Sequence, residues 1–203
     1  MLACAFALLI TVAPWFARNY ATFGRFIPFR DTLGLELHVG NCGDTSHWHA
    51  SWVGPWHNPA EWQDFKSLGE VRYMQREMQR GMMCIRSKPW QFAVLSLRRF
   101  AYVWTGFWSF DKAYLQEEPL DLPNVFFCTA LTILAAFGLR RLWRHNKSLS
   151  LVLGTMLLAF PSVYYITHVE VYVRRQIDPL IVVLAVYAVT GKNNEHHELI
   201  SEK

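Results

Sequence analysis

Charged residues are missing from two long stretches near the C-terminal end of this sequence. Residues 123–139 and 149–167, which are 17 and 19 residues long, contain no Asp, Glu, Lys or Arg. Each stretch is long enough to cross the hydrocarbon core of a bilayer as a helix. Transporters place functional charges inside their membrane spans, so the lack of charge argues against a transporter fragment. The sequence therefore predicts membrane-spanning helices here.

Cysteine is scarce as well, with four residues and no Cys-x-x-Cys spacing. This excludes the usual cysteine-rich zinc sites. Cys4 and Cys128 lie in apolar runs, whereas Cys42 and Cys84 lie in the polar middle of the chain. In an oxidising compartment Cys42 and Cys84 could form a disulfide. Two unrelated free thiols are the favoured interpretation, and the disulfide is the alternative.

Hydrophobic residues are abundant but unevenly distributed. They make up 52% of the 203 residues, yet the mean hydropathy is only +0.10, because the apolar residues gather at the two ends. The segment 140–148 holds four cations and no acid, which places it in the cytoplasm by the positive-inside rule. Residues 18–122 then face outward and the tail 191–203 inward. A third apolar stretch, 177–190, has only 14 residues.

The first 17 residues are apolar but lack the basic start of a signal peptide. Pro14 and Trp15 stand where a small-residue cleavage site would be. We therefore expect residues 1–17 to end a transmembrane helix and the chain to be the C-terminal portion of a longer protein. A cleaved signal sequence is the alternative.

The outward region is predicted to be mostly helical. Asn58 can cap a helix, Pro59 suits its first position, and Glu61 falls three residues after the cap, as in a capping box. Amphipathic helices are expected over about 59–87 and 89–108. The second mixes aromatics with arginines, which fits a headgroup boundary or an ordinary core helix equally well. The short runs 26–29 and 35–39 favour a small β-hairpin. The fold class is thus mainly α, a multi-pass transmembrane protein with an extracytoplasmic loop region.

A metal site is the less favoured interpretation of one histidine-rich segment. Its spacing matches no strong pattern, so solvated histidines are expected and no cofactor is predicted, although a divalent metal stays open. The candidate ligands are His38, His47, His49, His57, Cys42 and Asp44.

The segment PWFARNY places Arg18 one helical turn after Pro14. An arginine emerging at the outer interface can hold a lipid phosphate through bidentate hydrogen bonds, and plain snorkelling to the headgroups is the alternative. PWFARNY followed by Gly34 and by Gly40-Asn41 resembles the Pro-Trp-x-x-Arg-Asn, Gly, Gly-Asn pattern of bacterial GT-C glycosyltransferases. These include protein mannosyltransferases and lipid A aminoarabinose transferases.

The resemblance extends to the last outward turn. There the family often has Arg-Tyr-Arg-x-Pro-x-x-Pro, and this chain has Arg174, Arg175, the Ile177-Asp178 pair and Pro179. The first arginine, the tyrosine and the first proline of the pattern are missing, which weakens a phosphate-binding role at this turn.

The resemblance implies transfer of a sugar from a polyprenyl-phosphate carrier to an envelope acceptor on the outer face of the bacterial plasma membrane. The expected lipid-phosphate or substrate ligands are Arg18, Arg174 and Arg175. No pair of outward acids has a spacing that identifies a catalytic base, so none is assigned. Membrane lipids are expected partners and nucleic acid is not. The alternative is a non-catalytic assembly or anchoring module whose outer loop binds a partner.

Overall fold

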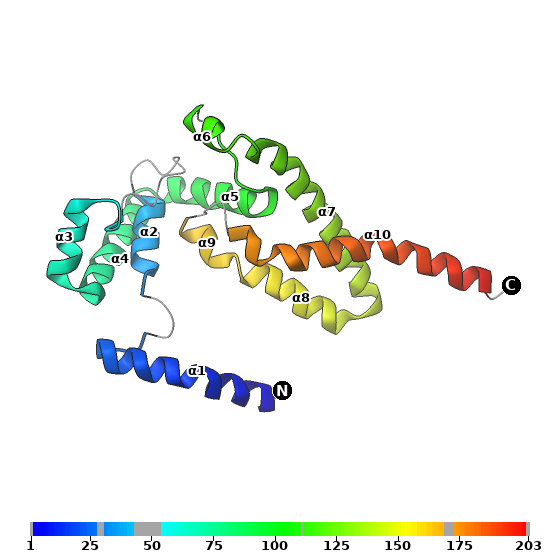
Figure 1. The fold of residues 1–203 in the computed structure, drawn as a ribbon, viewed down its shortest axis with the longest axis horizontal. Coiled ribbons are helices and arrows are strands. Elements are labelled where there is room, and N and C mark those ends of the chain that lie inside the picture. Colours follow the sequence, from blue (N-terminus) through cyan, green and yellow to red (C-terminus); the bar gives the residue numbers. More distant parts are fainter. Residues whose placement is uncertain (1, 28–30, 43–53, 111, 169–172, 202–203) are drawn as a thin grey trace. The chain divides into compact units, whose positions relative to one another are not determined.

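The chain is mainly helical in the computed structural model, which describes residues 2–27, 31–42, 54–110, 112–168 and 173–201 (Figure 1). It divides into two compact units, Met1–Ser87 and Lys88–Lys203. The described residues contain no strand, so the expected mainly α class is confirmed and the expected hairpin is wrong.

Four helices form the first unit. They are α1 (Leu2–Phe23), α2 (Leu33–Asn41), α3 (Pro59–Leu68) and α4 (Glu70–Ser87). Helix α1 ends at Gly24, whose φ of 64° lies in the left-handed region that favours glycine. Residues 28–30 of the expected hairpin lie outside the described residues, and 35–39 are part of α2. Leu35 and Val39, one helical turn apart, are both buried in one apolar cluster with Tyr73 and Met74 of α4. Packing against α4 therefore decides the conformation of this segment.

Local capping signals define α3. The side chain of Asn58 accepts a hydrogen bond from the backbone N–H of Ala60, and Pro59 is the first helical residue, as the sequence predicts. Glu61 does not behave as a capping-box residue, because its carboxylate accepts hydrogen bonds from Tyr73 and Arg76 instead. The single helix expected over 59–87 is divided at Gly69, which has a φ of 73°.

A disulfide joins the end of α2 to α4. Cys42 and Cys84 are bonded, with their Cα atoms 5.5 Å apart. The preference for two free thiols is therefore wrong. The two cysteines are separated by 42 positions, so no local pattern predicts the bond, which follows from the packing of α2 on α4. Disulfides of this kind are typical of oxidising compartments.

The second unit contains the remaining elements. They are α5 (Pro89–Thr105), α6 (Lys112–Glu117), α7 (Asp121–His145), α8 (Lys147–Ala159), α9 (Ser162–Ile166), the 3₁₀ turn η2 (Val173–Gln176) and α10 (Asp178–Ser201). Asn146 ends α7 through its backbone N–H and caps α8 through its side chain, which accepts from Leu149 N–H. The helix that begins at Lys147 is interrupted before Pro161, where the sequence predicts a kink.

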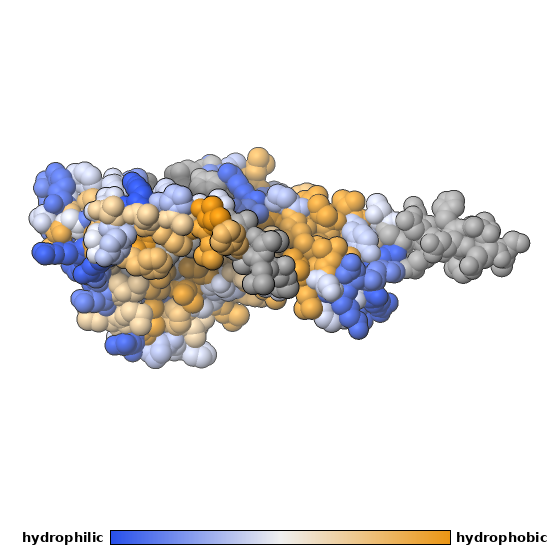
Figure 2. Space-filling view, turned by 90° about the horizontal axis from the view of Figure 1, so that it is seen from below, coloured by the Kyte–Doolittle hydropathy of each residue, from blue (hydrophilic) through white to orange (hydrophobic). Residues whose placement is uncertain are grey.

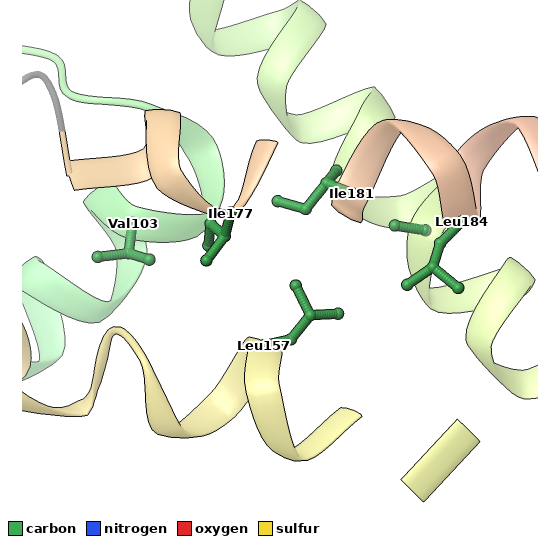
Figure 3. Close-up of a cluster of buried hydrophobic side chains, with 6 residues drawn as sticks. Val103, Leu157, Ile177, Ile181 and Leu184 are labelled. Carbon is green, nitrogen blue, oxygen red and sulfur yellow. The ribbon is translucent and has the colours of Figure 1, made fainter. Parts of the chain in front are cut away.

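The core of the second unit is formed by apolar side chains of α5, α7, α8 and α10, together with Ile177, which follows η2. Figure 3 shows Val103, Leu157 and Ile177 near one another, with Ile181 and Leu184 of α10 alongside. Helices α7 and α10 approach most closely at Gly138. A Cβ at Gly138 would lie 2.0 Å from the backbone oxygen of Leu184, so only glycine permits this approach.

Two helical segments of this unit are long and apolar enough to cross a membrane, Leu122–His145 and Lys147–Ile166. Only 17% and 22% of their most apolar windows are buried, whereas the core helix of a water-soluble protein is mostly buried. Hydrophobic residues show on the surface of the second unit, up to a hydrophilic patch where α7 meets α8 (Figure 2). The apolar helix Asp178–Thr190 is shorter than a usual span. A membrane role for this segment and for α1 stays a prediction.

Candidate functional site

Arg18 lies exposed near the end of α1. Its guanidinium carbon is 5.3 Å from the ring centroid of Trp15, within the range of a cation–π contact. Its Nη1 donates to Asn19 Oδ1 over 3.1 Å. These two contacts orient the guanidinium while leaving the residue accessible to an anion. Arg18 is therefore placed as a ligand for a phosphate would have to be.

Asn19, the next residue, has the opposite environment. It is 2% exposed, and its Nδ2 donates to the backbone oxygen of Ile27 over 2.8 Å. This bond ties the end of α1 to the chain beyond the Gly24 turn. An edge-to-face contact between Phe16 and Phe26, with ring centroids 5.4 Å apart, supports the same turn. In this pair, the buried Asn19 stabilises the turn through its hydrogen bond, whereas Arg18 is exposed beside the turn.

The glycines and the asparagine that follow PWFARNY in the same pattern contribute to helix packing. Gly34 lies where α2 crosses α4, and a Cβ there would be 2.1 Å from the backbone oxygen of Met74. Asn41 is buried, and its Nδ2 donates to the backbone oxygen of Leu37. Gly40 is buried as well. Sequence reasoning grouped these residues with Arg18, but their surroundings give them packing roles.

A network of acids and bases that sequence reasoning missed links α2, α3 and α4. Its centre is the fully buried carboxylate of Glu77, which pairs with His38 Nδ1. Arg76 Nε donates to Glu77 Oε1 over 2.9 Å and Arg80 Nη1 over 3.1 Å. Arg76 also donates to Glu61 and to Asp64, over 2.8 and 2.6 Å. The i,i+3 and i,i+4 spacings within α3 and α4 place these groups on facing sides, but their pairing across helices has no sequence signal.

This network is not suited to acid–base catalysis. Burial raises the pKa of Glu77, but hydrogen bonds from His38 and Arg76 outweigh it, so that the pKa lies below the ordinary glutamate value. A buried carboxylate that is held in its ionised form by three basic side chains is a weak base and is closed off from a substrate, so it is poorly placed to accept a substrate proton. The network is therefore a structural support for the first unit.

Asp31 differs from Glu77. It is half-buried just before α2, and burial raises the pKa of its carboxyl, with a further increase from the charge of Glu70 and a decrease from Arg25. Asp31 is thus an accessible acid of raised pKa in the first unit. Its place in the sequence does not separate it from the other acids of the region expected to face outward.

Arg174 and Arg175 are adjacent in η2 but have different environments. Arg174 is 5% exposed and donates four hydrogen bonds, described below, to groups of the second unit. Arg175 is exposed. Because most of the Arg174 N–H groups are already engaged, Arg175 is the better placed of the two for a phosphate. Arg18 belongs to the first unit and Arg175 to the second.

The histidine-rich segment falls largely outside the described residues, which leave out Asp44, His47 and His49. Within the described part, Cys42 is in a disulfide and cannot supply a thiolate, and His38 pairs with Glu77. No group of three possible metal ligands occurs among the residues that the structure describes.

No protein family, no curated protein and no solved structure matches this chain.

Proposed function

We propose that this chain belongs to an integral membrane protein of the bacterial plasma membrane that transfers a sugar from a polyprenyl-phosphate carrier. In this proposal the transfer is of the GT-C type and its acceptor lies on the outer face. The observation that carries the proposal is the exposed guanidinium of Arg18 next to the buried Asn19, at the end of an apolar helix. Arg18 holds the phosphate of the donor, and Arg175 is the second candidate.

Three features support a membrane orientation with α2, α3 and α4 on the outer side. Two helices of the second unit have the length and apolar exposure of membrane spans. The end of α7 and the start of α8 carry the basic cluster Arg140–Lys147, which favours the cytoplasm. The Cys42–Cys84 disulfide favours an extracytoplasmic, oxidising location for α2 and α4. The three features agree with one another although they are independent.

The chemistry of such a transfer requires positive charge at the leaving group. The carrier phosphate gains negative charge as the glycosidic bond breaks, and an arginine stabilises it through charge-assisted hydrogen bonds. A lysine would supply charge without the planar fork. The described acids do not identify a base for the acceptor hydroxyl, so the proposal assigns to this chain the phosphate-binding part of the reaction.

Replacement of Arg18 tests the proposal. Membranes containing the full reading frame are supplied with polyprenyl-phosphate sugars, and transfer to envelope acceptors is measured. We expect Arg18→Ala to raise the donor KM by roughly 10-fold or more, since a charge-assisted hydrogen bond is worth about 1.5 to 3 kcal/mol. Arg18→Lys should give a donor KM between that of the unmutated protein and that of Arg18→Ala. Arg25→Ala is the matched control, because Arg25 is also exposed but follows the Gly24 turn.

Equal effects of Arg18→Ala and Arg25→Ala would remove the phosphate-binding role. No transfer by membranes with the unmutated protein, from any polyprenyl-phosphate sugar, would remove the enzyme proposal. The non-catalytic module would then be favoured, and one observation supports it. Trp56 and Trp62 of the first unit are exposed and in ring contact, with centroids 5.5 Å apart, and form an aromatic surface suited to a protein partner.

A further inference from the structure

Helix α5 has its apolar and charged faces reversed relative to a helix on a water-soluble protein. Its exposed side carries Trp90, Val94, Leu97 and Phe100, which are 79%, 49%, 71% and 46% exposed. Their spacing of four, three and three residues makes them one continuous stripe. The opposite side buries Arg99, which is 5% exposed and donates to the backbone oxygen of Tyr165. In water, the burial preferences of these two faces would be exchanged.

The C-terminal end of α5 is held beside the interior of a candidate membrane span. The Trp104 backbone oxygen accepts from Thr132 Oγ1 over 2.7 Å and from Arg174 Nη1 over 2.6 Å. Thr132 lies in α7, eleven residues after its first residue, or roughly 16 Å along the helix axis. If α7 crosses the bilayer, the end of α5 therefore lies well below the outer surface.

The same hydrogen bonds satisfy the carbonyl groups at the C-terminal end of α5, which would otherwise lack partners in lipid. The last carbonyl groups of a helix have no partner within the helix, and lipid offers none. Thr105 Oγ1 donates to the Ala101 oxygen, and Thr132 and Arg174 donate to the Trp104 oxygen. Arg174 also brings a positive charge to the negative end of the helix dipole.

Arg174 ties three elements together at this point. Besides Trp104 of α5, it donates through Nη2 to the backbone oxygen of Cys128 in α7, over 3.0 Å. It donates through Nε to Asp178 Oδ1 at the start of α10, over 2.7 Å. This pairing compensates the charge of an arginine that is buried at this depth.

We propose that α5 enters the outer leaflet of the membrane, with the stripe Trp90–Val94–Leu97–Phe100 against lipid, and that Arg174 fastens its C-terminal end there. Trp90 lies in the headgroup region and Phe100 among acyl chains. The exposed Arg98 lies between them, where its long side chain reaches the phosphates. The proposal rests on the membrane embedding in the proposed function but not on sugar transfer.

The occupant of the stripe is lipid because the stripe is continuous with surfaces that share its chemistry. Helix α5 packs against α7, whose exposed side chains include Phe126, Phe127 and Phe137. A water-soluble partner would have to cover these aromatic residues as well. A bilayer covers all of them without further contacts.

Spin-label accessibility tests the proposal in the full protein reconstituted into lipid bilayers. Cys4 and Cys128 are replaced by serine, the disulfide is kept, and one nitroxide is attached at position 94, 97 or 100. Position 79 in α4, an exposed glutamine, is the water reference, and position 133 in α7, an exposed isoleucine, is the span reference. Collision with oxygen, which enters lipid, is compared with collision with a nickel chelate, which does not.

We expect the ratio of oxygen to nickel collisions to rise from position 94 to position 100, and to be at least roughly threefold higher at 100 than at 79. Equal ratios at 94 and 100 would mean that α5 lies flat. Ratios at all three that equal position 79 would place α5 in water. Either result overturns the proposal. Nickel access at position 133 would instead contradict the membrane embedding itself.

Arg174→Ala tests the fastening role. With the nitroxide at position 100, it should lower the oxygen to nickel ratio toward that at position 94, because the helix end loses its anchor. Arg174→Lys, which keeps the charge, guards against simple misfolding and should give a smaller change. Arg175→Ala should leave the ratio unchanged, since Arg175 is exposed. An unchanged ratio in Arg174→Ala overturns the assignment of the anchor.

Discussion

The two units are built from the same kind of element but place their charges in opposite ways. In the first unit, α2, α3 and α4 share a network of acids and bases around Glu77, and a disulfide closes the group. In the second unit, Arg99 and Arg174 are buried while large apolar side chains are exposed along α5, α7 and α10. On the proposed function, this difference follows from two solvents, with water around α2, α3 and α4 and lipid around much of the second unit.

The difference also shows which interactions each solvent makes valuable. On the same proposal, burying apolar surface stabilises the packing of α2, α3 and α4 because water surrounds these helices. Between helices in lipid that driving force is missing, and close packing at small residues and hydrogen bonds take its place. The close approach of Gly138 to Leu184 is an example of packing at a small residue. The hydrogen bonds from Arg174 to three acceptors are an example of the second kind of interaction.

Loss of the disulfide should have the largest effect and should be confined to the first unit. The bond closes a loop with a sequence separation of 42, for which the chain-entropy relation gives about 4 kcal/mol. Hydrogen exchange of the protein in lipid discs, with Cys42→Ser and Cys84→Ser together, should show lost protection in α2 and α4. Cys128→Ser in the second unit is the control. Protection lost equally in α7 and α10 would contradict the division into units.

Replacement of Arg174 should have the next largest effect, in the second unit. Arg174→Ala leaves the oxygens of Trp104 and Cys128 without this donor and Asp178 without its cation. We expect a loss of about 3 kcal/mol in the free energy of unfolding, measured by denaturant titration in detergent. Arg175→Ala should cost much less, because its side chain is exposed. Similar losses in the two variants would show that Arg174 has no special structural role.

Glycine substitutions should show that both units use one packing device. A Cβ at Gly34 would lie 2.1 Å from Met74 O, and a Cβ at Gly138 would lie 2.0 Å from Leu184 O. Alanine at either position should cost about 2 kcal/mol, since the helices must move apart. Gly154→Ala is the control, because its Cβ would meet only ordinary contacts. It should be neutral or stabilising by up to about 1 kcal/mol, and thermal melts of the three variants make the comparison.

The sequence predicted those features of the fold that depend on nearby residues. Asn58 and Pro59 start α3, and the helix interruption lies at Pro161, as local chemistry requires. The hairpin failed because α2 forms through contacts of Leu35 and Val39 with α4, which are distant in sequence. The disulfide and the network around Glu77 were missed for the same reason, since both depend on how α2, α3 and α4 pack.

The candidate site shows the same limit. The pattern around PWFARNY identified a group of residues but not the division of roles among them. Exposure separates Arg18 from Asn19, and it separates Arg175 from Arg174, although each pair is adjacent in sequence. An adjacent pair on a helix or turn points in different directions, and which direction meets protein depends on the rest of the fold. The sequence therefore located the arginines, but it could not distinguish the proposed anchor, Arg174, from the proposed phosphate ligands, Arg18 and Arg175.

Low pH should have the smallest effect on stability, and it should destabilise the first unit more than the second. The pKa of Glu77 lies below its ordinary value in the folded state, so the carboxylate stabilises the first unit fully above the ordinary glutamate pKa. That contribution is lost as the pH falls through the lowered pKa. Melts of the protein between pH 6 and 3 should thus show the first unit losing stability in acid.

Glu77→Gln isolates this contribution, because the amide keeps the shape but not the charge. It should lower the stability of the first unit by about 1 kcal/mol at pH 6, and the difference from the unmutated protein should shrink as the pH falls through the lowered pKa of Glu77. Hydrogen exchange in α4, with α10 as the internal reference, reports the change. A difference that stays constant with pH would mean that Glu77 acts by shape alone. The charge network would then not be what distinguishes the first unit from the second.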